Sequence, residues 1–399
     1  MLNRTFIVAA KRSAVGKING QFSSVRVDDL MAFVLKDILK SLPFDPTLID
    51  DVIIGCANQA GEDNRNLARM ALLLAGFPMS VPGSTTNRLC GSSLDALIDG
   101  FGRIQSGIAD CLIIGGAESM TRGPFVLSKA ESAFDRAQKM YDTTFGWRFQ
   151  NPKMEKMFPL LSMGETAEEV AMLYNISRLE QDQFALSSHQ KATAAWNRGD
   201  FTSEIVPYTV ELKKDSFIVN KDECPRADTT LEALSKLKPA FKKEGSVTAG
   251  NSSPMNDGAA GLLVVSEKFL KTHNLTPMIE VTGGAVRGVH PSTMGLGPIE
   301  AVKVLLKKYN KNIQDFDAIE LNEAFAAQAL GCIKGLNLDT SKVNLNGGAI
   351  AIGHPLGGSG ARIVTTLAHQ MNKNKALKES LATMCIGVGQ GIAVSFRNC

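Results

Sequence analysis

The order of elements expected in the first part of the chain returns in its last part. Residues 6–10 read as a buried strand, residues 28–42 as a helix and residues 51–55 as a second buried strand. The same order returns as a strand, a glycine-rich loop, a helix and a strand over residues 278–281, 282–297, 298–309 and 317–321. An internal repeat of this kind predicts two related α/β units that pack together.

The composition and the pattern of the sequence change between the two repeats, from about Thr121 to Ser246. This stretch holds both tryptophans, several methionines and many charges, followed by an amphipathic helical pattern from Glu165 to Gly199. The alternation of strand and helix patterns does not continue through this stretch. We therefore predict an inserted loop domain at residues 121–246, because long excursions from a compact domain usually carry function. Residues 1–120 and 247–270 then form the N-terminal half, and residues 271–399 form the C-terminal half.

Composition excludes several classes of protein. A chain of 399 residues that is 44% hydrophobic can bury more than one core. Its net charge of +3 is too small to predict nucleic-acid binding. No apolar run reaches the roughly 18 to 20 residues of a membrane span, and the start lacks a secretory pattern, so we expect a cytoplasmic protein with no membrane partner. Seven cysteines without a C-x-x-C pair indicate reduced thiols, with neither a disulfide framework nor a metal site.

Cys90 lies in a short polar turn that leads directly into the helical pattern of residues 94–98. A cysteine at a helix N-terminus meets unpaired backbone N–H groups and the positive end of the helix dipole. These features lower the pKa of the thiol and offer donors to an oxyanion. Cys90 is therefore a candidate nucleophile, although a buried structural cysteine is the common alternative.

His354 lies in a loop, residues 346–360, that contains six glycines in fifteen positions. Such a loop allows tight turns and close backbone approach, and Pro355 restricts the backbone of the histidine. The loop lacks the Gly-Lys-Ser/Thr ending of a phosphate-binding loop, which favours a rigidly held catalytic imidazole. The other four histidines are expected to have surface or capping roles.

Two further motifs follow predicted strands. Cys385 ends a buried strand and opens a glycine-rich turn that includes Gly387, and ligands bind at such strand ends. Asn322 begins the segment Asn-Glu-Ala-Phe directly after the strand at 317–321. Its amide is a candidate to bind a water or an oxyanion, with helix capping as the alternative.

Taken together, these motifs resemble the thiolase family over essentially the whole chain. The resemblance rests on four segments in this order: Asn87-Arg88-Leu89-Cys90, Asn322-Glu323-Ala324-Phe325, Gly353-His354-Pro355 and Cys385-Ile386-Gly387-Val388-Gly389. It implies an α/β thiolase fold, with duplicated βαβαβαββ halves in five layers and an inserted loop domain that holds coenzyme A. It also implies a homo-oligomer, either a dimer or a dimer of dimers.

The resemblance also implies roles for individual residues. Cys90 would take the acyl group, His354 would activate it, and Cys385 would move the proton on the α-carbon of acetyl-CoA. One oxyanion hole would be formed by His354 and by an Asn322-bound water, and the other by the amides of Cys90 and Gly387. Coenzyme A or acetyl-CoA would be a substrate, with no permanently bound cofactor.

For coenzyme A, the family pattern matches at Arg226 and Ser253. Two departures from the pattern, Ser93 and Pro254, replace residues that are usually glycine.

The substrate is less closely defined. Residues 55–66 and 142–149 look like the 3-oxoadipyl-CoA thiolases of aromatic-compound degradation. Acetoacetyl-CoA thiolase and the 3-ketoacyl-CoA thiolase of fatty-acid oxidation are the alternatives. The acyl pocket is expected to include Met163, Phe325 and Arg148, with Arg148 paired to a terminal carboxylate. A decarboxylating condensing enzyme and a non-catalytic acyl-CoA carrier are disfavoured, because Cys90, His354 and Cys385 are all present.

Overall fold

The computed structural model describes residues 3–399. Five strands of the first repeat lie side by side in the order β4–β3–β5–β10–β1, and the two-residue β2 (Gly16–Lys17) pairs with β10. Strand β3 runs parallel to both β4 and β5, whereas β10 runs antiparallel to β5 and β1. Their bounds are β1 (Thr5–Arg12), β3 (Asp51–Gly55), β4 (Gly83–Thr86), β5 (Cys111–Ser119) and β10 (Asn256–Ser266).

The second repeat reproduces this arrangement in the order β12–β13–β14–β11. Strands β12 and β13 are parallel, and β14 is antiparallel to both of its neighbours, as in β3–β5–β10–β1. The predicted duplication is therefore confirmed. Strands β1 and β11 pair antiparallel over three residues and join the two halves into one ten-stranded sheet. The bounds are β11 (Ile279–Gly288), β12 (Ala318–Leu321), β13 (Glu379–Ile386) and β14 (Gln390–Asn398).

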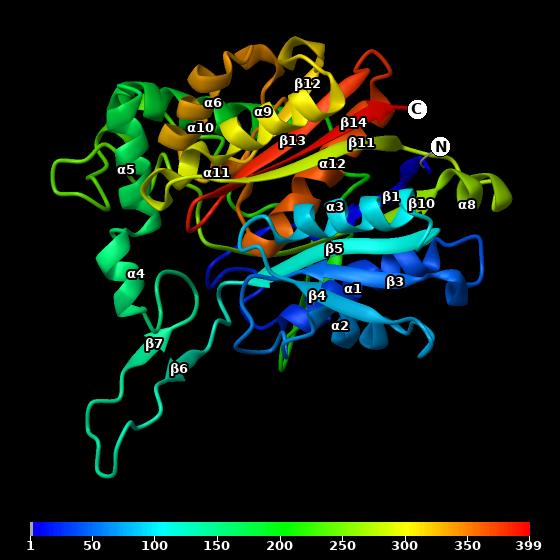
Figure 1. Ribbon diagram of the computed structural model, residues 1–399, viewed down its shortest axis with the longest axis horizontal. Coiled ribbons are helices and arrows are strands. Elements are labelled where there is room, and N and C mark those ends of the chain that lie inside the picture. The colour runs from blue at the N-terminus through cyan, green and yellow to red at the C-terminus, as the bar shows by residue number, and fades with distance from the viewer. Residues whose placement is uncertain (1–2) are drawn as a thin grey trace.

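Helices complete a five-layer stack, as Figure 1 shows. Two helices cover the outer face of the first half, two lie between the halves, and two cover the outer face of the second half. Helix α12 is the more deeply buried of the middle pair, and each of its first ten residues is buried. In that order the pairs are α1 (Val27–Lys40) with α2 (Leu67–Ala75), α3 (Ser92–Gln105) with α12 (Ser359–Lys373), and α9 (Gly297–Tyr309) with α10 (Ala326–Leu336).

The inserted segment forms separate short elements. Within residues 121–246, all of them described, no strand joins the ten-stranded sheet. The β6–β7 hairpin projects from the body of the molecule (Figure 1). The elements are β6 (Phe125–Leu127), β7 (Met140–Asp142), α4 (Pro152–Met157), α5 (Met163–Leu173), α6 (Arg178–Asn197), β8 (Tyr208–Glu211), β9 (Ser216–Val219) and α7 (Leu231–Ser235).

The remaining elements are short. They are α8 (Glu267–Thr272), α11 (Ala349–Ile352) and the 3₁₀ helices at Pro46–Leu48, Pro291–Leu296, Ile313–Asp315, Thr340–Lys342 and Leu356–Gly358. No helix found within residues 3–399 has the length and apolar character needed to cross a membrane.

The single helix expected between Glu165 and Gly199 is wrong. The segment forms two helices, α5 and α6, and Asn175 between them has a left-handed φ of 48°. Each helix begins with its own capping box, from Ser162 and from Ser177, so the sequence specifies two starts. The four strands of the insert were also missed, because each has only three or four residues.

The two middle helices meet at their N-terminal turns. The Ser93 hydroxyl of α3 accepts a hydrogen bond from the Ala361 backbone N–H of α12 at 2.8 Å. A Cβ atom on Gly360 would lie 2.5 Å from the backbone nitrogen of Leu94. The two helices therefore approach each other as closely as glycine permits. Ser93, a departure from the family pattern, forms a hydrogen bond across this contact.

Substitution of Gly360 by alanine should destabilise the protein. We expect Gly360→Ala to lower the free energy of unfolding by about 1–3 kcal/mol, because the added methyl group overpacks the contact between α3 and α12. Gly102→Ala in α3 is the matched control, since a Cβ atom added there would have no neighbouring atom within 4 Å. That change should raise stability by up to about 1 kcal/mol through helix propensity. Urea unfolding of both variants measures the difference, and equal stabilities would contradict the packing argument.

Candidate active site

Cys90 lies in the turn between β4 and α3, and this turn packs against the end of β13. A Cβ atom on Gly91 would lie 2.5 Å from Ile386 Cδ1, so glycine is required for this approach. Leu89 has a left-handed φ of 47° and Val388 has a φ of 64°, both unusual for these residue types. Two strained residues thus flank Cys90 and Gly387, and such strain is concentrated at functional sites.

Cys90 is half-buried, and it lines a cavity. Burial raises the pKa of Cys90 to about 11, although a hydrogen bond with the Gly387 backbone opposes the shift. The expectation that the start of α3 lowers the pKa of this thiol is therefore wrong. Desolvation of the thiolate outweighs the favourable backbone groups, and the resting side chain is a neutral thiol.

His354 is held by contacts on both its backbone and its ring. Its backbone N–H donates to Asn256 Oδ1 at 2.8 Å, and its Nδ1 lies 2.6 Å from the Ser359 hydroxyl. Gly353 before it has a φ of 120°, which only glycine adopts readily. Burial lowers the pKa of His354 to about 3, with a further contribution from the charge of Arg362. The imidazole is therefore neutral and fixed in orientation.

Cys385 lies near the end of β13 and is buried. Burial raises the pKa of its thiol well above the ordinary value, and the proximity of Cys90 raises it further. The two thiols therefore lie in one electrostatic environment, from opposite halves of the chain. Cys385 belongs to the same apolar cluster as Met163 and Phe325.

Asn322 is a buried amide without a hydrogen-bond partner. Its backbone N–H donates to the Thr383 carbonyl at 3.0 Å, but neither Oδ1 nor Nδ2 has a partner within residues 3–399. Helix α10 has Phe325 as its N-cap residue, so the capping alternative for Asn322 is wrong. A buried amide left unpaired costs about 1–3 kcal/mol, which favours a bound water or a ligand oxygen at this position.

Two buried carboxylates support the site and were not assigned this role from the sequence. Glu118 accepts hydrogen bonds from the backbone N–H groups of Ala57, Asn58 and Gly357, each at 2.9 Å. It therefore ties the loop after β3 to the loop that carries His354. A signal was available, because Glu118 is the one charged residue in the otherwise apolar or small sequence of β5.

Glu323 has the same function on the other side of the site. Its carboxylate accepts from the Ser188 hydroxyl and the Asn344 amide, both at 2.7 Å, and from the Ile350 backbone N–H at 3.2 Å. The turn that begins at Asn322 is thereby fixed to α6 and to the glycine-rich loop. The segment that begins at Asn322 was identified from the sequence, but the sequence did not indicate that the Glu323 side chain is buried.

A cavity of about 290 Å³ opens onto Cys90. Gly387, Met163 and Arg148 also line it, and its surface is mainly apolar. Phe325 does not line the cavity but packs against Phe241 with ring centroids 6.0 Å apart. The structure therefore brings four of the predicted site residues to one cavity and places Phe325 in the apolar cluster with Cys385.

Arg226 and Ser253 lie outside this cavity. Arg226 is exposed, and its guanidinium lies 3.0 Å from Nε2 of His189. His189 is buried, and burial together with Arg226 lowers its pKa to about 4, so the surface or capping role expected for it is wrong. The Ser253 backbone N–H donates to the Ala324 carbonyl at 2.9 Å, next to Phe325.

Comparison with known families gives a match on both halves. The family description "Thiolase, N-terminal domain" matches residues 5–268, and "Thiolase, C-terminal domain" matches residues 275–398. The chain belongs to the thiolase family. This thiolase is 52% identical over 398 residues to the "Beta-ketoadipyl-CoA thiolase" of Pseudomonas aeruginosa, with 99% of each chain covered. It is 51% identical to the "3-oxoadipyl-CoA/3-oxo-5,6-dehydrosuberyl-CoA thiolase" of Escherichia coli, with 98% of this chain and 99% of the relative covered.

Solved structures agree with the thiolase fold. An acetyl-CoA acetyltransferase of Bacillus anthracis superposes with a TM-score of 0.93 at 38% identity, covering 100% of this chain and 99% of the other. Human mitochondrial 3-ketoacyl-CoA thiolase superposes with a TM-score of 0.91 at 39% identity, with the same coverage. The thiolase fold and acyltransferase class expected from the motifs are confirmed.

The raised pKa of Cys90 predicts how the thiol responds to pH. Iodoacetamide reacts with the thiolate, so labelling of Cys90 should keep rising about tenfold per pH unit beyond pH 9. The same peptide in urea-denatured protein should level off near the ordinary thiol pKa of about 8.5. Mass spectrometry of the Cys90 peptide measures both rates. Labelling that is already maximal near pH 7 would instead indicate a resting thiolate paired with imidazolium.

Proposed function

We propose that this thiolase cleaves 3-oxoadipyl-CoA with coenzyme A into acetyl-CoA and succinyl-CoA, or catalyses the reverse Claisen condensation. The observation that carries the proposal is identity of about half over the full chain to thiolases named for this substrate. The solved thiolases named for other substrates share 38% and 39% identity with the chain. The cavity beside Cys90 has room for a short acyl chain.

The proposed first step breaks the carbon–carbon bond. His354 accepts the proton of the Cys90 thiol, and the sulfur attacks the ketone carbon. The bond between that carbon and the α-carbon breaks, and its electron pair forms the enolate of acetyl-CoA. Cys385 then donates its proton to the α-carbon, and acetyl-CoA leaves. Free coenzyme A then gives its thiol proton to the Cys385 thiolate, and its sulfur attacks the acyl-Cys90 thioester. The bond between the acyl carbon and the Cys90 sulfur breaks, Cys90 regains its proton from His354, and the shortened acyl-CoA leaves.

Donors for the developing oxyanions come from two groups of residues. The unpaired amide of Asn322 supports a role in holding a water, which would act together with His354. The hydrogen bond between the Gly387 backbone and the Cys90 thiol supports the assignment of this amide to the second oxyanion, with the amide of Cys90. Fixed donors in a site that excludes water stabilise such charge without reorganisation.

The directions of the pKa shifts of Cys385 and His354 fit the roles proposed for them. A thiol whose pKa lies well above the ordinary value stays protonated at neutral pH, so Cys385 holds the proton that the enolate requires. A neutral His354 is able to accept the proton of Cys90 when the substrate is in place. The three reacting side chains, Cys90, His354 and Cys385, are then all uncharged in the resting site.

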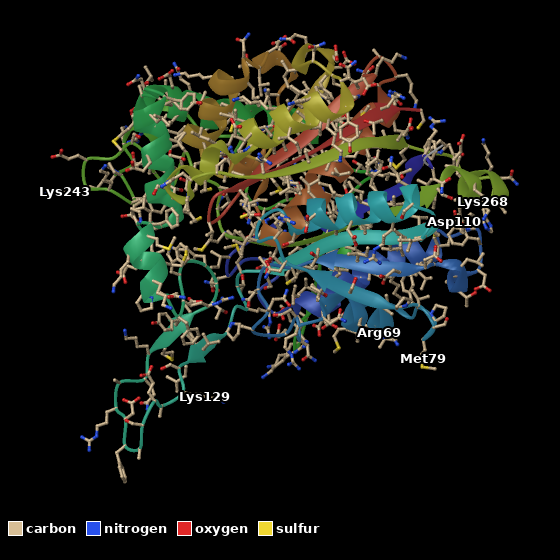
Figure 2. All side chains as sticks on the ribbon, in the orientation of Figure 1. Arg69, Met79, Asp110, Lys129, Lys243 and Lys268 are labelled. Atoms are coloured by element: carbon tan, nitrogen blue, oxygen red, sulfur yellow. The ribbon has the colours of Figure 1, made fainter. Side chains whose placement is uncertain are left out.

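We further assign coenzyme A binding to the insert at residues 121–246, with Arg226 in the insert and Ser253 in the N-terminal half as contacts. In this proposal residues 1–120 and 247–270 form the N-terminal half, and residues 271–399 form the C-terminal half. The same insert supports assembly as a dimer or a dimer of dimers. Its β6–β7 hairpin exposes Phe125, Leu127, Phe134 and Met140, a concentration of apolar surface typical of a contact between proteins. Figure 2 shows this hairpin, with Lys129 labelled, extending away from the rest of the molecule.

A cytoplasmic location is part of the proposal. All seven cysteines are free, as the reduced state of Cys90 and Cys385 requires.

The acyl intermediate tests this function directly. Brief exposure to 3-oxoadipyl-CoA without free coenzyme A should leave a succinyl thioester on Cys90, since thioester transfer to coenzyme A cannot follow. Mass spectrometry of the Cys90 peptide detects it, and Cys90→Ala is the control. A succinyl group on Cys385 would reverse the assigned roles. Acylation by acetoacetyl-CoA alone would indicate a four-carbon substrate.

The role of Cys385 is tested by separating two reactions. In Cys385→Ser, exchange of the acetyl group between acetyl-CoA and labelled coenzyme A should survive, because it needs only Cys90 and His354. Cleavage of 3-oxoadipyl-CoA should fall by about 10²- to 10⁴-fold, because a hydroxyl is a far weaker acid than a thiol. Steady-state assays of both reactions give the comparison. Cleavage near the wild-type rate would exclude Cys385 as the proton donor.

A further inference from the structure

The cavity beside Cys90 contains a single charged residue. Its other described lining residues are apolar or neutral, and they include Leu89, Met163, Trp147 and Leu356. Arg148 alone contributes a charge, and it is half-buried. A lone cation at the wall of an apolar cavity offers nothing to an uncharged acyl chain, but it complements an anionic one.

The guanidinium of Arg148 is not engaged by a carboxylate. Within residues 3–399 its side chain donates one hydrogen bond, from Nη1 to the Thr143 carbonyl at 3.0 Å, and forms no ion pair. Three other arginines of the insert are each paired, namely Arg122 with Glu62 at 2.6 Å, Arg178 with Asp182 at 2.7 Å and Arg198 with Asp200 at 2.8 Å. The remaining N–H donors of Arg148 are therefore available for a ligand.

The segment that carries Arg148 is fixed in place. Asn58, which also lines the cavity, donates from Nδ2 to the hydroxyl of Thr143 at 3.1 Å. The Thr143 hydroxyl in turn donates to the Pro124 carbonyl at 2.7 Å. The indole N–H of Trp147 donates to the Leu161 carbonyl at 3.0 Å. Arg148 thus extends from an anchored loop, as a residue that selects among ligands requires.

We propose that Arg148 binds the distal carboxylate of the acyl chain and thereby selects dicarboxylic acyl-CoA substrates. The inference rests on the proposed thiolase reaction, because it concerns the acyl group that Cys90 carries. The succinyl chain of the intermediate has four carbons, of which the first is the thioester carbonyl and the last is the carboxylate. Arg148 and Cys90 line the same cavity of about 290 Å³, so a short acyl chain bound there would extend from the thiol toward the guanidinium. A planar guanidinium fork suits a carboxylate, and the pair avoids an uncompensated charge in the apolar cavity.

The test compares two substrates of equal chain length. 3-Oxoadipyl-CoA ends in a carboxylate, and 3-oxohexanoyl-CoA ends in a methyl group at the same position. For Arg148→Gln, kcat/KM for 3-oxoadipyl-CoA should fall about 10- to 100-fold, while that for 3-oxohexanoyl-CoA stays within about twofold. Arg148→Lys should recover part of the loss, because it restores the charge without the fork. Thermal unfolding and the retained 3-oxohexanoyl-CoA activity establish that the variants fold.

Arg397→Gln is the matched control, because this exposed arginine lies on β14, outside both the cavity and the insert, and should leave both substrates unaffected. Equal loss on both substrates in Arg148→Gln would overturn the proposal and assign Arg148 to coenzyme A or to the fold. An unchanged preference in Arg148→Gln would also overturn it, while leaving the proposed function intact. A wild-type enzyme that does not prefer 3-oxoadipyl-CoA over 3-oxohexanoyl-CoA would overturn the proposed substrate as well.

Discussion

The contact between the N-terminal turns of α3 and α12 holds the two halves of the chain together at the reactive centre. Cys90 precedes α3 and His354 precedes α12, so the approach of these turns determines where thiol and imidazole lie. Small residues make the approach possible: a Cβ atom on Gly360 would lie 2.9 Å from the Ser93 hydroxyl oxygen. The hydrogen bond from the Ala361 backbone to Ser93 crosses the same contact. A larger side chain here would change stability and active-site geometry together.

Buried carboxylates then fix the loops that the helix contact brings together. Glu118 accepts four hydrogen bonds and Glu323 accepts three, and each joins segments that are distant in sequence. Burial raises the pKa of both groups, while their donors oppose the shift. Such carboxylates are expensive to bury, and they are stable here because nearly every oxygen lone pair has a donor. The loops that carry Asn322 and His354 are consequently fixed by hydrogen bonds to several other segments.

Much of this arrangement could be predicted from the sequence. The duplication, the strands at 51–55 and 318–321, and the position of Cys385 at a strand end follow from local apolar patterns and glycine-rich turns. The pKa of Cys90 could not be predicted in this way, because desolvation depends on how tightly the opposite half covers the thiol. The absence of a partner for the Asn322 amide within residues 3–399 is likewise a tertiary property. Sequence patterns identify reactive groups, whereas the environment that tunes them comes from segments far along the chain.

The same environment explains how a site with raised thiol pKa values is able to catalyse acyl transfer. A low-dielectric cavity disfavours the thiolate before the substrate binds, which keeps Cys90 and Cys385 protonated. It also strengthens hydrogen bonds to charge that develops on a substrate oxygen. In the proposed reaction, fixed donors such as the Gly387 amide would therefore stabilise the transition state more than the resting state. Burial that suppresses the free nucleophile thus favours reaction only when an acyl-CoA carbonyl is present to receive the charge.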